Sequence, residues 1–239
     1  MPGVGCPEDF LNSERMVVLK SKVIWAVFSA VLFLLLIVAV RTVDVAPIGP
    51  ADTSVGLSSI NQSVHASLGT SDTWYKVSKY LGYASLALAA CFALLGLVQL
   101  IQHKGLKGVD PSLFVLCGLY VAVAVLYVFF NKVAVNYRPV LEPGQTVPES
   151  SFPSTHTLMA CTIFGSAVMV LPRFVKNTGL LRTLQVACVA ALVLTVFARL
   201  LSGVHWVTDI LGGLLLSMAL LSVTAALLSK YSPSGSDPE

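Results

Sequence analysis

The sequence predicts an all-α fold, a bundle of six transmembrane helices with an amphipathic helical segment in the first outside loop. Of the 239 residues, 56% are hydrophobic and only 11% are charged, and the mean hydropathy is +0.82. Because a soluble domain carries about 25% charged residues, this composition is typical of an integral membrane protein. Six apolar segments meet or approach the roughly 20 residues that cross a hydrocarbon core of about 30 Å. They are 23–40, 80–101, 112–130, 155–171, 184–201 and 207–228.

These segments form a single membrane-embedded domain over residues 1–239. We expect the tails, 1–13 and 230–239, to be flexible, because neither contains an apolar run that would hold it to the bundle. The first apolar run is too long for a removable signal peptide, so we interpret it as a transmembrane helix. The segment 155–171 is short, and we expect it to gain a turn from its flanks.

The first outside loop, 41–79, is too long for a bare connection and has a helix pattern of its own. Apolar residues recur near one face, at Val55, Leu57, Ile60, Val64 and Leu68. This spacing predicts an amphipathic helix on the membrane surface, where a lid or connector role is favoured over direct contact with substrate. Trp74 and Tyr75 are expected to anchor the second span at the interface.

The distribution of basic residues predicts the orientation in the membrane. Nine of the 15 Lys and Arg residues fall in the two terminal segments and the second and fourth loops, and six fall in the first, third and fifth loops or beside them. Cytoplasmic loops carry the excess of positive charge. We therefore expect a multi-pass protein of the plasma (cell) membrane with both termini in the cytoplasm. The net charge of +3 is scattered rather than clustered, which predicts no nucleic-acid partner.

A first polar cluster closes the third span. Pro139 disfavours helix at Arg138, so the chain should leave the helix there and present Lys132 and Arg138 at the outer interface. Two cations at the outer end of the third span indicate an anion-binding site. Taken alone, they are also explained by basic side chains reaching from a helix end to lipid headgroups.

A second cluster opens the fourth span with Pro153, Ser154, Thr155 and His156. Proline beside Ser and Thr at the start of an apolar run predicts a helix N-terminus, whose unpaired N–H groups and dipole favour an anion. His156 then lies in the first turn. The alternative is an ordinary helix cap followed by an interfacial histidine.

A third cluster links the fifth and sixth spans and contains Arg199, His205 and Asp209. Arg199 follows Arg182 by about 26 Å of helix, so it lies at the outer face. His205 and Asp209 are four residues apart, which lets the carboxylate hold one imidazole nitrogen and leave the other available. The alternative is a structural His–Asp pair beside an arginine that reaches for headgroups.

The three clusters fall on one side of the membrane, and together they contain the parts of a phosphate site that needs no metal. Phosphoryl transfer requires charge stabilisation on the equatorial oxygens, a nucleophile in line, and an acid for the leaving oxygen. Three cations, two histidines, one orienting carboxylate and a helix N-terminus can supply these functions. We therefore expect no cofactor.

The three clusters resemble the type 2 phosphatidic acid phosphatase (PAP2) family, whose pattern is Lys-x6-Arg-Pro, then Pro-Ser-Gly-His, then Ser-Arg-x5-His-x3-Asp. The matching residues are Arg138, Pro139, Pro153, Ser154, His156, Arg199, His205 and Asp209. Thr155 stands where the pattern has Gly, and Ala198 where it has Ser. Neither change removes a charged or nucleophilic group.

The lysine of the first motif is the larger departure. Lys132 precedes Arg138 by six residues rather than seven, and Asn131 holds the expected position. Either the backbone bulges before Pro139 and lets Lys132 reach the site, or Asn131 supplies a neutral donor there. We assign Lys132 to the site.

The resemblance implies a mechanism and a class of substrate. His205, oriented by Asp209, would attack phosphorus and form a phosphohistidine, while His156 would protonate the leaving oxygen and then activate water. The phosphate would be held by Lys132, Arg138, Ser154, Thr155 and Arg199.

A site at headgroup depth suits a membrane lipid substrate, with undecaprenyl diphosphate first and phosphatidylglycerophosphate or phosphatidic acid next. Lys76, Lys79 and Arg41 could meet a second phosphate, but membrane anchoring is the preferred interpretation of each. Two other functions stay open on the same fold. One is a non-catalytic protein that binds or moves lipid, which the displaced Lys132 favours, and the other is a lipid phosphotransferase.

Overall fold

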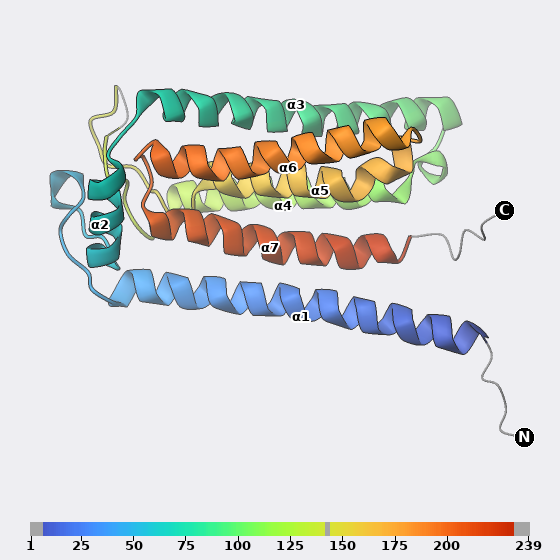
Figure 1. Ribbon diagram of the computed structural model, residues 1–239, viewed down its shortest axis with the longest axis horizontal. Coiled ribbons are helices and arrows are strands. Elements are labelled where there is room, and N and C mark those ends of the chain that lie inside the picture. Colours follow the sequence, from blue (N-terminus) through green and yellow to red (C-terminus); the bar gives the residue numbers. More distant parts are fainter. Residues whose placement is uncertain (1–6, 142–143, 232–239) are drawn as a thin grey trace, which may run out of the picture.

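The computed structural model describes residues 7–141 and 144–231, and these residues form an all-α bundle (Figure 1). The α-helices are α1 (Pro7–Thr42), α2 (Ser58–Leu68), α3 (Asp72–His103), α4 (Pro111–Lys132), α5 (Thr155–Phe174), α6 (Thr178–Leu201) and α7 (Val207–Ser229). Two short 3₁₀ turns, η1 (Pro50–Asp52) and η2 (Leu106–Gly108), lie in the connections. Six of the helices are long and apolar enough to cross a membrane, which confirms the predicted fold class.

Most helix boundaries differ from the sequence prediction, and α1, α5 and α3 bear on the argument. α1 begins at Pro7, inside the segment predicted as an N-terminal tail, while 1–6 and 232–239 lie outside the described residues. α5 gains the expected turn and ends at Phe174. α3 begins at Asp72, eight residues before the predicted span, because Ser71 caps it and an ion pair between Asp72 and Lys76 joins its first two turns.

α5 lies at the centre of the bundle and packs against α3, α4, α6 and α7. Of the 18 residues in the most apolar stretch of α5, 56% are buried inside the protein, against 11% to 39% in the corresponding stretches of the other spans. Its hydropathy is also the lowest of the six, at 1.5. A helix enclosed by protein need not be apolar on every face, which is why the short, less apolar span can be the central one.

α1 packs along α7 at the edge of the bundle (Figure 1). It also reaches the loop before α5, because the Phe33 ring lies 5.8 Å from the ring of Phe152 and 5.9 Å from that of Phe130. Phe152 is fully buried, so the first helix helps to fix the segment that leads into α5.

Two adjacent glycines let α7 approach the start of α5. A Cβ atom at Gly212 would lie 2.6 Å from the Phe152 ring, and one at Gly213 would lie 2.9 Å from the Ser154 carbonyl oxygen. The Ser154 N–H also donates to the Asp209 carbonyl oxygen at 2.9 Å. The second and third sequence clusters are therefore joined backbone to backbone.

α2 lies across the end of the bundle at which α3, α5 and α7 begin (Figure 1). The predicted helix is present, but it is held by a polar residue. Ile60 and Leu68 are exposed, whereas Asn61 is fully buried and donates to the Thr208 hydroxyl at 3.0 Å and to the Gly56 carbonyl at 2.9 Å. α2 thus caps the first turn of α7 and leaves Ile60 and Leu68 outward, while Val64 is half-buried.

Candidate active site

All three polar clusters meet at the end of the bundle covered by α2. The Trp206 indole donates to the Tyr137 carbonyl oxygen at 2.6 Å, which joins the third cluster to the first. The Ser151 N–H donates to the Asn136 carbonyl oxygen at 2.9 Å, which joins the first cluster to the approach to α5. Loops far apart in sequence are thereby held as one unit.

His205 and Asp209 form a buried pair. The His205 Nδ1 lies 3.4 Å from the Asp209 Oδ2, and the two residues are 3% and 0% exposed. The same oxygen accepts the Trp206 N–H at 2.9 Å, so one carboxylate orients both the imidazole and the start of α7. Within the described part of the chain, the His205 Nε2 has no hydrogen-bond partner. The pairing fixes the ring and leaves Nε2 available for chemistry.

Electrostatics keep the His205 ring neutral. Burial lowers the pKa of His205 well below its usual value of 6.5, and the charges of Arg199 and Arg138 lower it further. The proton of a neutral ring lies on Nδ1, because that nitrogen donates to the carboxylate. Nε2 then carries the lone pair that a nucleophile needs.

The two arginines of the prediction are both at the site, and each is held by neighbours. Arg199 is 1% exposed, donates from Nη1 to the Ser78 hydroxyl at 3.3 Å, and lies 5.8 Å from the centre of the Tyr75 ring. Arg138 pairs through Nε with the Glu149 carboxylate at 3.3 Å. A planar guanidinium held in this way is well suited to bind phosphate oxygens.

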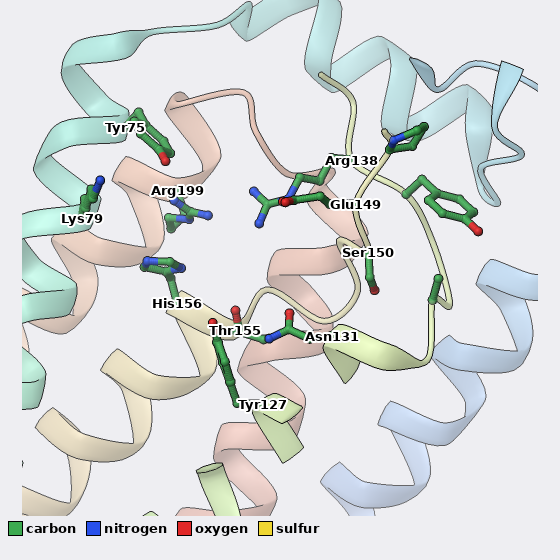
Figure 2. A pocket seen from close by; sticks show the side chains of 13 residues that line it. Tyr75, Lys79, Tyr127, Asn131, Arg138, Glu149, Ser150, Thr155, His156 and Arg199 are labelled. Atoms are coloured by element: carbon green, nitrogen blue, oxygen red, sulfur yellow. The ribbon is translucent and has the colours of Figure 1, made fainter. Parts of the chain in front are cut away.

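A cavity of about 610 Å³ opens beside these groups (Figure 2). From the prediction, Arg138, Thr155, His156 and Arg199 line it. His205 and Asp209 do not line it, although the charges of Arg199, Arg138 and His156 all lower the pKa of His205. The cavity thus places a second histidine, two arginines and the N-terminus of α5 around one space.

Ser154 and Lys132 are placed differently from the expectation. Ser154 is fully buried, and its hydroxyl accepts from the Thr157 hydroxyl at 3.0 Å, so it caps α5 rather than lining the cavity. α4 ends at Lys132, the chain is non-helical from Val133 to Arg138, and Lys132 does not line the cavity. Asn131 does line it, together with Tyr127 one turn earlier. The structure therefore favours Asn131 over Lys132 at the lysine position of the first motif.

Sequence reasoning missed several residues that shape the site and gave Lys79 a membrane-anchoring role in preference to a phosphate contact. Tyr75 and Lys79 of α3 line the cavity, and Tyr75 faces Arg199 rather than serving only as an interfacial anchor. Asn136 and Ser151, both buried, approach the Asp209 carboxylate. His65 of α2 lies 3.0 Å from the Gly203 carbonyl oxygen, so α2 also holds the loop that carries His205.

The signal that could have found the residues of α3 is its N-terminus. A Ser-Asp pair followed by a lysine four residues after the Asp marks a helix start and extends α3 toward the site. The contacts of α2 carried no such signal, because their partners lie 138 and 147 residues away along the chain.

A second, apolar groove of about 440 Å³ adjoins the cavity. Its walls come from α3, α4 and α5, and include Leu86, Val123 and Ile163. Lys79, Tyr127, Thr155 and His156 line both spaces. The cavity, with its charged lining, and the apolar groove thus share one boundary. This arrangement fits an amphiphile, whose charged head would lie in the cavity and whose apolar chain would lie in the groove.

Comparisons with known proteins identify the family and the fold. A sequence model of the PAP2 superfamily matches residues 84–232, more than half of the chain. Among solved structures, the fold is similar to the crystal structure of a transmembrane PAP2-type phosphatidylglycerolphosphate phosphatase from Bacillus subtilis. The TM-score is 0.59 at 20% sequence identity, and the match covers 87% of this chain and 98% of that one. No curated protein gave a significant match.

Proposed function

The chain belongs to the PAP2 superfamily, and from this premise we propose that it is a membrane lipid phosphatase that releases phosphate from a lipid phosphate or diphosphate. The observation that carries the proposal is that His156, Arg138 and Arg199 line one cavity and lie close to the buried His205–Asp209 pair. These groups come from three separate parts of the chain. Each has a role in phosphoryl transfer.

The proposed reaction has two steps. The His205 Nε2 attacks the terminal phosphorus, so a P–N bond forms as the bond from phosphorus to the leaving oxygen breaks, and His156 gives its proton to that oxygen. The leaving oxygen is the bridging oxygen of a diphosphate or the ester oxygen of a lipid monophosphate. His156, now neutral, takes a proton from water, whose oxygen attacks phosphorus and breaks the P–N bond. Phosphate leaves, and the Nε2 lone pair of His205 is restored.

The chain's own cations stabilise the charge that develops on the phosphoryl oxygens. Arg138 and Arg199 face the cavity, and the N-terminus of α5 adds the positive end of its dipole at Thr155. In this proposal no metal ion takes part.

The proposed substrate carries two phosphate groups. Undecaprenyl diphosphate remains first, and phosphatidylglycerophosphate next, because a cavity of about 610 Å³ with several cations can hold more than one phosphate. The similarity to a phosphatidylglycerolphosphate phosphatase supports the second candidate. The lipid chain would lie in the apolar groove. Phosphatidic acid, with one phosphate, comes last.

We also propose that the protein lies in the plasma membrane with the site on the outer face. The support is the bias of basic residues toward the segments at the opposite end of the bundle, which places both termini in the cytoplasm. A lipid phosphate in the outer leaflet would then reach the site without crossing the bilayer.

The test is phosphate release by the purified full chain in detergent, on each of the three lipids and with EDTA present. We expect turnover of a two-phosphate lipid that EDTA leaves unchanged, and loss of at least a thousandfold in His205→Ala. His103→Ala is the control, because His103 is exposed at the far end of α3. Near-normal activity of His205→Ala, or strict dependence on an added divalent metal, would contradict the proposal.

A further inference from the structure

The first motif lacks its lysine at the cavity, although phosphate chemistry gains from a cation there. Asn131 holds the position seven residues before Arg138 and lines the cavity, but an amide brings no charge. Lys132 has the charge but does not line the cavity. If the site uses a third cation, another element must supply it.

One face of α3 is turned toward the site. Tyr75, Ser78, Lys79 and Gly82 follow the spacing that places residues on one side of a helix. Ser78 accepts from Arg199 at 3.3 Å, and the Tyr75 ring lies 5.8 Å from the same guanidinium. A Cβ atom at Gly82 would lie 3.3 Å from the His156 ring. Lys79 sits among three residues that all contact the site.

Lys79 also lines the cavity itself and the apolar groove beside it. Figure 2 shows it on the same side of the cavity as His156 and Arg199. Its positive charge acts on the His156 ring, as do those of Arg199 and Arg138. Lys79 therefore stands where the charged head of an amphiphile would meet its apolar chain.

The neighbouring lysine of α3, Lys76, differs from Lys79 in its position relative to the cavity and in its ion pairing. Lys76 is bound to Asp72 at 2.6 Å, with its side chain 64% exposed, and does not line the cavity. Within the described residues, no acidic side chain forms an ion pair with Lys79. The two lysines are thus a matched pair, one at the site and one away from it.

We propose that Lys79 binds the substrate phosphate and supplies, from α3, the cation that the first motif of this chain has lost. The assignment rests on the proposed phosphatase function. It replaces the interpretation of Lys79 as a membrane anchor. It also concerns a residue outside the family match, which begins at residue 84.

The experiment compares Lys79→Met with Lys76→Met in the purified full chain. We expect kcat/KM for phosphate release to fall about a hundredfold in Lys79→Met, because a charge-assisted contact to the phosphate is lost, and to change less than twofold in Lys76→Met. Lys79→Arg should retain most of the activity. Adding Asn131→Lys to Lys79→Met restores the family's lysine and should recover at least tenfold. A merely structural defect would not be repaired in this way.

Binding of inorganic orthovanadate, a phosphate mimic, provides a second readout that does not depend on turnover. We expect at least tenfold weaker binding in Lys79→Met and unchanged binding in Lys76→Met. Activity and vanadate binding within twofold of wild type in Lys79→Met would overturn the assignment, as would a greater loss in Lys132→Met. If wild type releases no phosphate from any of the lipids, the phosphatase proposal fails, and vanadate binding alone decides the role of Lys79.

Discussion

Replacing Asp209 by asparagine tests how the carboxylate assists His205. One oxygen of Asp209, Oδ2, accepts the hydrogen bonds from both the His205 Nδ1 and the Trp206 N–H. An amide oxygen in the same place can accept both hydrogen bonds, so the tautomer that leaves Nε2 available is retained. What the variant loses is the negative charge opposite an imidazole that becomes positive as the P–N bond forms. A hydrogen bond to a charged group contributes about 1.5–3 kcal/mol.

That loss predicts a fall of about a hundredfold in kcat, equivalent to about 2.7 kcal/mol. Asp209→Ala removes the acceptor of both hydrogen bonds, so its fall should exceed the asparagine value by at least tenfold, and its folded state should also be less stable by about 1–3 kcal/mol. The assay is steady-state phosphate release from a lipid diphosphate in detergent, with thermal unfolding measured on the same samples. A change below threefold in Asp209→Asn would refute the reasoning, because the charge would then be unnecessary. A loss equal to that of the alanine variant would refute the shared-oxygen geometry.

Three further changes probe the pH response, the helix packing and the cover of the site. Because the folded His205 stays neutral while the unfolded ring gains a proton below pH 6.5, stability should fall as pH drops through that value, by up to about 1.4 kcal/mol per pH unit. His205→Gln should therefore lose less thermal stability between pH 7 and pH 5 than wild type does, and equal losses would contradict the lowered pKa. Gly213→Ala should abolish most activity, because the added methyl group forces α7 away from the start of α5. Gly118→Ala is the control, because the space around Gly118 is open, and it should be neutral or stabilise the fold by about 0.5–1 kcal/mol. Similar effects of the two variants would argue against the close approach of α7 to α5. Asn61→Ala should lower the free energy of unfolding by about 1–3 kcal/mol, because its hydrogen bonds to the first turn of α7 and to Gly56 are lost. Gln62→Ala, at an exposed neighbouring position, should change the free energy of unfolding little. A neutral Asn61→Ala would show that the Asn61 side chain does not hold α2 against α7.

The bundle and the three clusters were predictable because both depend on local patterns. Lipid-length apolar runs define the spans, and a Pro-Ser-Thr sequence marks the start of α5. Once the spans are fixed, helix length alone places Arg199 and His156 at the same end of the bundle. The fourth apolar run looked short for a span, and the burial of α5 among four helices explains why a less apolar helix suffices there.

The first two turns of α3 were not predicted, because hydropathy treats a charged helix end as a loop. Asp72, Lys76 and Lys79 lower the apolar score there, yet the Ser71 cap and the Asp72–Lys76 pair stabilise the helix. This error hid the face of α3 that carries Tyr75 and Lys79.

The lysine of the first motif shows a different limit. Sequence spacing left two options, a bulge that brings Lys132 inward or a neutral donor at Asn131. Because α4 continues without interruption through both residues, only the face shared with Tyr127 meets the cavity. Packing determines which side chains at the end of a helix face the cavity, and the spacing of a sequence motif does not.

Trapping the covalent intermediate tests the central claim most directly. The full chain is mixed with a lipid diphosphate labelled at the terminal phosphate, quenched in alkali within one turnover, and digested for mass spectrometry. We predict an acid-labile, alkali-stable phosphoryl group on the His205 peptide, lost in His205→Ala together with phosphate release. Phosphate release at the normal rate without label on His205, or with label on another residue, would contradict the account.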